Sequence, residues 1–178
     1  MAESRKRNIP VKRGDQLFRK ACAAWDRGKL EQAFELFLKA AKVGDKSSQS
    51  NLGYFYDTGI YVSKNTKQAL FWYRKAYRQG YFPAASNIAT VYRDQGDSKR
   101  MVLWYKRAAA LGDTDALFEL GKRYQNGECV RKDLIKAKVF YQRILKHKYA
   151  TEEDKTNARD RVKKILTSIK KHAMRSRT

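Results

Sequence analysis

Aromatic and cationic side chains alternate in the segment from Gln68 to Gly80, which reads QALFWYRKAYRQG. Aromatic rings can stack on nucleic-acid bases and Lys and Arg can pair with phosphates, so the segment is a candidate nucleic-acid surface. The same aromatic residues can instead fill the core of a helical protein. Which elements surround the segment decides between the two interpretations.

Other side chains with potential chemistry are isolated along the chain. Cys22 and Cys129 form no CxxC or Cys/His cluster, so we expect buried free thiols in a reducing compartment rather than a disulfide. His147 and His172 are single side chains near expected helix ends. The sequence lacks the G-x-S-x-G, P-loop and H-E-x-x-H motifs. We therefore expect a protein that is not an enzyme and uses no metal or cofactor.

The composition favours helices and an electropositive surface. The 178 residues include only two prolines and ten glycines, and 40 Lys and Arg against 18 Asp and Glu give a formal net charge of +22. Such a charge favours an acidic partner, or serves solubility alone. The sequence shows no secretory signal and no apolar run that could span a bilayer, so a cytoplasmic location is expected, or a nuclear one in a eukaryote.

The chain contains internal repeats. Three similar units begin at glycines, which are Gly44, Gly80 and Gly112. At the same distance after each glycine stands a large residue followed by a small one: Leu52-Gly53, Ile88-Ala89 and Leu120-Gly121. The first and third units also share a loop, residues 59–62 and 127–130, that the middle unit lacks.

The second half of each unit is a helix-like segment. ALFWYRKAYRQG (69–80) aligns with MVLWYKRAAALG (101–112) and AKVFYQRILKHK (137–148), and upstream with AFELFLKAAKVG (33–44). In this alignment Trp72 and Tyr73 fall in register with large apolar pairs of the other segments, which predicts that both rings are core. Phe71 and Tyr77 have no aromatic counterparts, and the alignment gives them no role.

Apolar residues recur at helical spacing in each half-unit, so each unit is predicted to be two helices joined by a glycine turn. Small residues that let the paired helices approach closely are Ala40, Gly53, Ala76, Ala89, Ala108 and Gly121. A hairpin this short buries its apolar stripe only against neighbours. The predicted fold is all-α: a right-handed α-solenoid of about four helix-turn-helix repeats with a C-terminal capping helix.

The predicted boundaries follow the repeats. Residues 1–13 form a flexible basic tail, 14–43 a tetratricopeptide-like hairpin, 44–147 three repeats (44–79, 80–111 and 112–147), and 148–178 a basic amphipathic capping helix and tail. Thr151 is the predicted N-cap of the capping helix, and Glu152, Glu153 and Asp154 follow it as a helix start. The helix has one predicted apolar stripe: Ala158, Val162, Ile165, Leu166, Ile169 and Ala173.

The repeat pattern A/S-x3-L-G-x2-Y-x2-G-x2-V, then A-x2-W/F-Y-x-K/R-A and a glycine, resembles the Sel-one-like repeat (SLR) family, a relative of the tetratricopeptide repeat. The first unit carries it at Ser48, Leu52, Gly53, Tyr56, Gly59, Val62, Ala69, Trp72, Tyr73, Lys75, Ala76 and Gly80. The second unit departs from it by lacking the G-x2-V loop, and the third by Phe140 for Trp and Ile144 for Ala. The paired cysteines of some members are missing from this chain.

The resemblance implies a non-catalytic adaptor whose concave groove binds a peptide, a loop or a folded domain; in bacteria, similar repeats belong to effector, immunity or envelope-signalling systems. By analogy, first-helix residues would line the groove: Ser50, Tyr54, Asp57, Ser86, Thr90, Arg93, Phe118, Lys122 and Gln125. Among them Tyr54, Arg93, Phe118 and Lys122 are the strongest candidates, because aromatic and cationic anchors dominate binding energy. Alternatively, some of these side chains pack between neighbouring repeats.

The second helices carry a column of cations, here called the basic ladder: Lys39, Lys42, Arg74, Lys75, Arg78, Lys106, Arg107, Arg143 and Lys146. A basic ladder on the convex face can follow a phosphate backbone, contact an acidic protein or simply face solvent. The termini add basic residues that suit nucleic-acid arms, import signals or solubilising tails: Arg5, Lys6, Arg7, Lys12, Arg13, Arg175 and Arg177.

Two hypotheses follow from these surfaces. The first is a cytoplasmic scaffold that binds an acidic protein surface or peptide in its concave groove. The alternative is a nucleic-acid binder, of RNA in particular, that uses the basic ladder and the basic termini.

Overall fold

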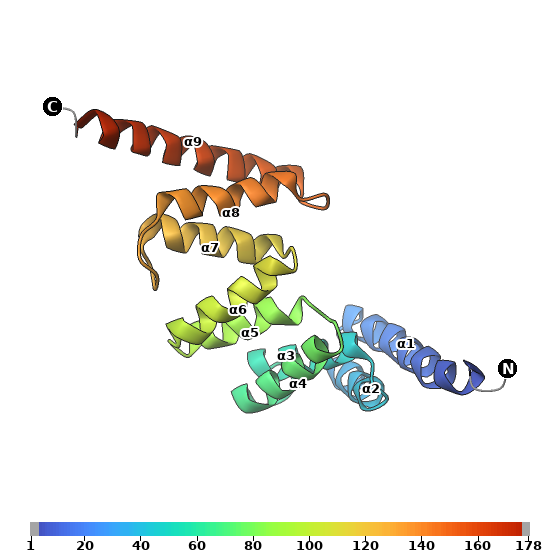
Figure 1. The fold of residues 1–178 in the computed structure, drawn as a ribbon. Coiled ribbons are helices and arrows are strands. Elements are labelled where there is room, and N and C mark those ends of the chain that lie inside the picture. The colour runs from blue at the N-terminus through green and yellow to red at the C-terminus, as the bar shows by residue number, and fades with distance from the viewer. Residues whose placement is uncertain (1–3, 176–178) are drawn as a thin grey trace. The chain divides into compact units, whose positions relative to one another are not determined.

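A computed structural model describes residues 4–175, with side chains described for 13–172 and 174. Every regular element in that range is an α-helix (Figure 1). The helices are α1 (Ser4–Asp26), α2 (Leu30–Lys42), α3 (Lys46–Thr58), α4 (Thr66–Arg78), α5 (Ala84–Asp94), α6 (Ser98–Ala110), α7 (Thr114–Asn126), α8 (Leu134–Lys146) and α9 (Glu152–Arg175). The all-α class predicted from the sequence is confirmed.

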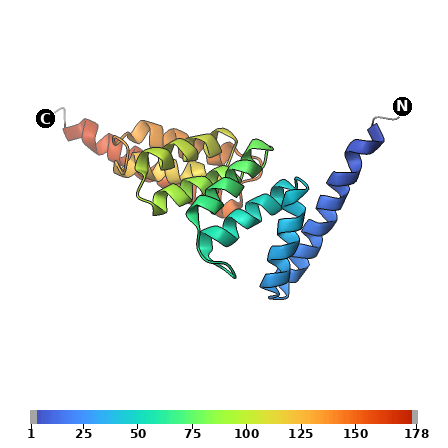
Figure 2. The same ribbon diagram turned by 90° about the horizontal axis from the view of Figure 1, so that it is seen from below.

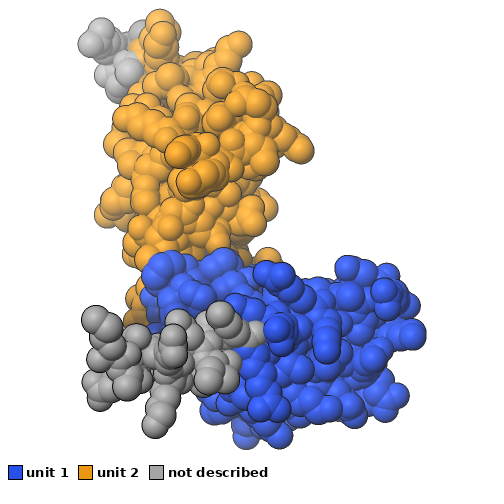
Figure 3. All heavy atoms as spheres, turned by 90° about the vertical axis from the view of Figure 1, so that its right-hand side faces the viewer, with its two compact units in different colours: residues 1–91 blue, residues 92–178 orange. Residues whose placement is uncertain are grey.

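The chain divides into two compact units, residues 1–91 and 92–178 (Figure 3), with α5 spanning the boundary. In the first unit α1 packs on α2, α2 on α3, and α3 on α4; Figures 1 and 2 both show α1 beside α2. In the second unit α6 packs on α7, α7 on α8, and α8 on α9. Each unit is therefore a stack of consecutive helices, the arrangement expected of helical repeats.

The helices at the two ends of the chain are long. Helix α1 begins at Ser4, within the segment 1–13 that the sequence predicts as a flexible tail, and α9 ends at Arg175. Apart from Arg13, the terminal cations have side chains outside the described residues. The structure therefore does not test whether the basic termini are nucleic-acid arms, import signals or solubilising tails. At the start of α9 the Thr151 hydroxyl accepts a hydrogen bond from the Asp154 amide at 3.1 Å, which confirms the predicted N-cap.

Five further helices begin with the cap geometry of α9, in which a side-chain oxygen accepts a hydrogen bond from the backbone amide three residues later. The capping residues are Asp45, Asn65, Asp97, Asp113 and Asp133, with distances from 2.6 to 3.0 Å. Each bond satisfies an amide that the first helical turn leaves without an intrahelical partner. The caps fix where α3, α4, α6, α7 and α8 start.

The two loops that the sequence matches are also alike in conformation. Gly59 and Gly127 end α3 and α7 in the left-handed region, and two residues later Tyr61 (φ 65°) and Cys129 (φ 60°) both adopt positive φ. Cys22 and Cys129 are free, as expected, but Cys22 is only half-buried and Cys129 is exposed. The prediction of buried thiols is wrong for Cys129 because this residue lies in the loop rather than on a helix face.

Small residues bring the paired helices together, as predicted. Ala40, Ala76, Ala89 and Ala108 have no exposed surface. A Cβ placed on Gly53 would lie 2.5 Å from the Tyr73 ring, and the Tyr141 ring fills the corresponding space at Gly121. Each tyrosine of the second helix therefore uses the space that glycine leaves on the first.

The rings of the QALFWYRKAYRQG segment divide between core and surface. Trp72 is 9% exposed and Tyr73 is 1% exposed, which confirms both as core. Phe71 is 54% exposed and meets the edge of Trp72 at 5.1 Å between ring centroids. Tyr77 is half-buried, with its ring 6.4 Å from that of Phe82. The core interpretation thus holds for the two rings that repeat along the chain.

The apolar residues of α9 do not form one covered stripe. Ala158 and Ile165 are buried and Val162 and Ile169 are half-buried, but Leu166 is 42% exposed. The predicted single stripe is therefore wrong at Leu166, because the rotation of α9 on α8 turns Ile165 inward and its neighbour outward. Ala173 lies outside the described side chains.

Candidate functional site

The groove candidates of the first unit differ in exposure. Tyr54 on α3 is 43% exposed, and its ring centroid lies 6.0 Å from that of Trp25 on α1. Ser50, one turn earlier, is buried and leaves little surface for a partner. Ser86 and Thr90 on α5 are half-buried. Tyr54 is therefore the groove candidate of this unit that presents a large contact surface, with its ring held by Trp25.

Arg93 is the first groove candidate of the second unit. Its side chain is 47% exposed, and its Nε donates a hydrogen bond to the Asp94 carboxylate at 3.1 Å. An exposed ion pair of this kind contributes about 0–1 kcal/mol to stability. Breaking the Arg93–Asp94 ion pair therefore costs little stability, so the guanidinium could bind another carboxylate instead.

The candidates on α7 pack against neighbouring helices. The Phe118 ring meets the Tyr141 ring of α8 edge-on at 5.3 Å, and the Arg161 guanidinium of α9 lies 5.8 Å from the Phe118 centroid. The Gln125 side chain accepts a hydrogen bond from the Tyr141 hydroxyl at 3.1 Å. Phe118 thus follows the alternative of packing on a neighbouring element through Arg161 of α9, whereas Gln125 bonds to α8 within its own repeat. Lys122, on the same helix, is half-buried.

A hollow of about 280 Å³ opens beside Phe118 and is lined by Thr114, Asp115, Phe118, Glu119, Ile144, Asp154 and Asn157. Burial raises the pKa of the Asp115 carboxyl, and the nearby carboxylates of Asp113, Asp154 and Glu119 raise it further. In a chain with a net charge of +22, this is a local acidic region. These carboxylates make the hollow less favourable for a negatively charged group than the basic surfaces elsewhere on the chain.

Several cations of the basic ladder contact the protein itself. Lys75 Nζ lies 5.1 Å from the Trp72 ring centroid, and the Arg107 guanidinium lies 4.5 Å from that of Trp104. Both pairs have the cation three residues after the tryptophan, so the contact repeats with the sequence.

Arg143 and Lys39 have other partners. Arg143 on α8 donates from Nη2 to the Ala109 carbonyl at the end of α6, at 2.6 Å, and Lys39 lies 3.9 Å from the Glu35 carboxylate. The remaining ladder cations are exposed apart from Arg74, which is half-buried: Lys42, Arg78, Lys106 and Lys146. The basic ladder is thus a mixture of cations that stabilise the repeats and cations that face solvent.

Comparison with known proteins places the repeats in a family. A family model described as Sel1 repeat matches residues 28–45, 46–81, 102–113 and 114–147, which together make up more than half of the chain. The chain belongs to the Sel1 repeat family. The match extends upstream into the hairpin 14–43 and leaves residues 82–101 unmatched, where the second repeat has lost its loop.

Two solved structures share the Sel1 repeat fold of this chain. A protective antigen of uropathogenic Escherichia coli strains, with an SLR fold, is 30% identical, with a TM-score of 0.62 over 73% of this chain and 30% of its own. A Sel1 repeat protein from Oxalobacter formigenes is 32% identical, with a TM-score of 0.62 over 73% of this chain and 55% of its own. The predicted helical-repeat fold is confirmed.

A curated relative is the ERAD-associated E3 ubiquitin-protein ligase component HRD3 of Candida glabrata, which is 27% identical over 128 residues. The match covers 67% of this chain and 15% of the relative. The Sel1 repeats of this chain therefore correspond to a small part of a much longer protein.

Arg123 is a buried cation that the sequence analysis did not identify. Its side chain is 8% exposed, and Nη2 lies 3.2 Å from the Glu119 carboxylate and 3.3 Å from Met101 Sδ of α6. Nη1 lies 3.7 Å from Glu128. In the repeat alignment, Arg123 occupies the column of Phe55 and Val91, which are buried. A cation at a position where the other repeats have apolar residues is the feature of the sequence that could have identified Arg123.

Gln49 is a second buried polar residue in an apolar column. It has no exposed surface and aligns with Ala85 and Leu117. Its Nε2 donates to the Ala41 carbonyl at 3.2 Å, and its Oε1 accepts from Gln79 Nε2 at 2.7 Å. Gln49 thereby joins the ends of α2 and α4 through the start of α3, so its role is to fix the packing of neighbouring repeats.

Two further observations concern membrane-spanning helices and clusters of potential metal ligands in the part of the chain that the structure describes. Within it, no helix is both long and apolar enough to cross a membrane. Nor do the described side chains include a group of three or more His, Cys, Asp and Glu positioned around a common metal site.

Proposed function

We propose that this Sel1 repeat protein is a non-catalytic scaffold that binds an acidic protein surface or peptide through its concave groove. The observation that carries the proposal is the exposed ring of Tyr54, fixed 6.0 Å from Trp25. An aromatic ring that is already held in place loses little conformational freedom on binding. Tyr54 is the proposed anchor of the first unit, and Arg93 and Lys122 are those of the second, where Phe118 contributes mainly to packing.

Charge supports an acidic partner. The net charge of +22 attracts acidic proteins over a distance of about 10 Å at 0.1 M salt, and so speeds encounter. The carboxylates around Asp115 form an exception within the groove face. Acidic side chains of the partner are therefore expected to meet Arg93 and Lys122 rather than the hollow beside Phe118.

The relatives support a scaffold. HRD3 is a component of a ubiquitin-protein ligase, and this chain matches a part of it. A bacterial effector, immunity or signalling system is one setting for such a scaffold, and both similar solved structures are bacterial. In either setting the repeats bind other proteins and the chemistry belongs to the partner.

RNA binding through the basic ladder is the competing function. It requires cations that are available to phosphates, but Lys75 and Arg107 stack on tryptophans and Arg143 binds a backbone carbonyl. These three cations have partners within the repeats, which favours a structural role for them and leaves the exposed Lys42, Arg78, Lys106 and Lys146 as the ladder cations that face solvent. The observations therefore favour the protein scaffold.

Affinity purification with and without nuclease separates the two functions. The tagged protein is captured from its native cells in both arms, and the co-purifying proteins and nucleic acid are quantified. The scaffold proposal predicts the same protein partner in both arms and little ultraviolet absorbance from nucleic acid. Partners that disappear after nuclease treatment, together with retention of RNA at about 50 mM salt, would contradict it.

A further inference from the structure

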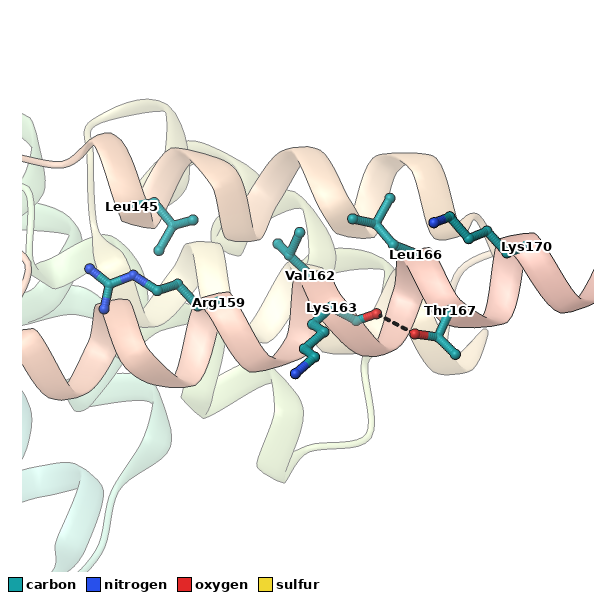
Figure 4. A pocket seen from close by; sticks show the side chains of 7 residues that line it. All are labelled: Leu145, Arg159, Val162, Lys163, Leu166, Thr167 and Lys170. Atoms are coloured by element: carbon teal, nitrogen blue, oxygen red, sulfur yellow. Dashed lines mark hydrogen bonds between the residues drawn. The ribbon is translucent and has the colours of Figure 1, made fainter.

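One face of α9, beside the face that packs on α8, lines an open hollow. The hollow is about 350 Å³ in volume, and Figure 4 shows its lining: Leu145 of α8 with Arg159, Val162, Lys163, Leu166, Thr167 and Lys170 of α9. Each α9 residue has another lining residue three or four positions away, so they form one continuous face of the helix. This face is distinct from the one that carries the buried residues Ala158 and Ile165.

The hollow combines an apolar floor with a cationic rim. Leu145, Val162 and Leu166 supply the apolar surface, and Leu166 remains 42% exposed. The rim consists of three cations, Arg159, Lys163 and Lys170, of which Arg159 also lies 3.8 Å from the exposed Glu152 carboxylate. After Asp160 the sequence contains no further Asp or Glu up to its last residue.

We propose that this hollow is the docking site for an amphipathic helix of another protein, with acidic side chains beside its apolar stripe. A helix presents apolar residues at intervals of three or four, which matches the spacing of Val162 and Leu166 along α9. Its flanking carboxylates would reach the three rim cations. Such a helix continues the stacking by which α8 already packs on α7 and α9 on α8.

Other occupants fit the observations less well. A second copy of this chain brings another +22 charges to a basic rim, which is repulsive. A small molecule requires a site that encloses most of its surface, whereas this hollow is open to solvent. The inference rests on the proposed function in that the occupant is a protein, but it uses none of the anchors Tyr54, Arg93 and Lys122.

A designed peptide probe tests the proposal on the full-length protein. The probe is a fluorescein-labelled helical peptide of about 18 residues with Leu on one face and Glu beside it. Fluorescence anisotropy should show saturable binding. A peptide of the same composition, scrambled to remove the apolar face, should bind at least about tenfold more weakly. Equal binding of the two peptides would overturn the proposal.

Two variants locate the site. Leu166→Asp should weaken binding of the probe about tenfold or more, because it places a charge on the apolar floor. Leu103→Asp is the matched control, since Leu103 on α6 is 47% exposed and lies outside the hollow. The control should bind as the original protein does. An unchanged affinity in the Leu166 variant would overturn the placement.

A charge exchange keeps the test independent of folding. Lys163 and Lys170 are both exposed, so Lys163→Glu with Lys170→Glu should leave the circular dichroism spectrum unchanged. The double variant should lose the Glu probe and instead bind a probe with Lys in place of Glu. Failure of this exchange would overturn the assignment of the rim.

Nucleic acid and membranes are tested in parallel arms, with single-stranded RNA and with vesicles that contain anionic lipid. A protein occupant would be overturned if RNA or vesicles displace the probe and also bind the Leu166→Asp variant as tightly as they bind the original protein. If the probe fails but the nuclease-resistant partner is still captured, this inference fails while the proposed function stands.

Discussion

The ring of Tyr73 lies in the space where a Cβ on Gly53 would stand, 2.5 Å from the nearest ring carbon. Tyr141 makes the same contact with Gly121, where the corresponding separation is 2.8 Å. In two repeats, therefore, a glycine on the first helix and a tyrosine on the second form one packing unit. This unit sets how closely the helices of each hairpin approach.

Gly53→Ala is expected to destabilise the protein. The added methyl group overlaps the Tyr73 ring, and overpacking of this kind costs about 1–3 kcal/mol, more than the gain in helix propensity of about 1 kcal/mol. Urea denaturation followed by circular dichroism measures the change. Repeating the substitution in a Tyr73→Ala background should remove most of the loss. A loss of the same size in both backgrounds would show that the ring is not its cause.

Arg123→Met is expected to lower the free energy of unfolding by about 2 kcal/mol, because it leaves the Glu119 carboxylate without its closest cation at a partly buried site. Arg123→Lys should recover only part of the loss, since an ammonium cannot reproduce the two-pronged contact of the guanidinium. Thermal and urea unfolding measure both variants. Full recovery with Lys would mean that charge alone matters at this position.

The cations of the basic ladder are expected to differ in their contribution to stability. Arg107→Ala removes the contact with Trp104 and should cost about 0.5–1 kcal/mol, whereas Lys106→Ala at the exposed neighbour should change stability by less than about 0.5 kcal/mol. Tryptophan fluorescence during urea titration reports both. Equal effects would indicate that Arg107 is an ordinary solvated cation.

Alkaline pH is expected to destabilise the protein through its buried tyrosines. Burial raises the pKa of Tyr141 to about 12 and raises that of Tyr73 as well. Because the phenol of an unfolded chain ionises near pH 10, the unfolded state loses its proton first, and stability is lost as the pH rises from about 10 toward about 12. Urea midpoints at about pH 9 and about pH 11 measure this loss.

The variant Tyr73→Phe with Tyr141→Phe is the control for the alkaline effect. It should show a smaller decrease of the unfolding free energy across this pH interval than the original protein. Each pH unit in which one tyrosine stays protonated only in the folded state accounts for about 1.4 kcal/mol. A decrease of the same size in the double variant would assign the effect to other groups.

Features that recur in every repeat were predictable from the sequence. The glycine turns, the small residues at the helix contacts and the buried second residue of the Trp-Tyr pairs each follow from a column that repeats along the chain. Repetition identifies these features because the same helix–helix contact recurs in several repeats and uses the same residue types each time. The all-α fold and the family followed from those columns.

Features that occur once were not predictable in the same way. Arg123 and Gln49 stand in apolar columns, and their partners come from neighbouring helices whose side-chain directions the sequence does not specify. Ile165 and Leu166 are adjacent and both apolar, and only the rotation of α9 on α8 decides which one is buried. The packing of Phe118 and Gln125 against Tyr141 likewise depends on how α8 lies against α7.

The most direct test of the scaffold is capture of the native partner by a variant of its three anchors. Tyr54→Ala, Arg93→Ala and Lys122→Ala together remove the proposed anchors, an exposed aromatic ring in the first unit and two cations in the second. Substitution of the exposed ladder cations Lys39, Lys106 and Lys146 by alanine removes a similar amount of charge elsewhere and serves as the control. With nuclease present and both variants folded, quantitative mass spectrometry should show loss of the partner from the anchor variant alone. Retention of the partner by the anchor variant, or its loss from the control, would contradict binding through the groove.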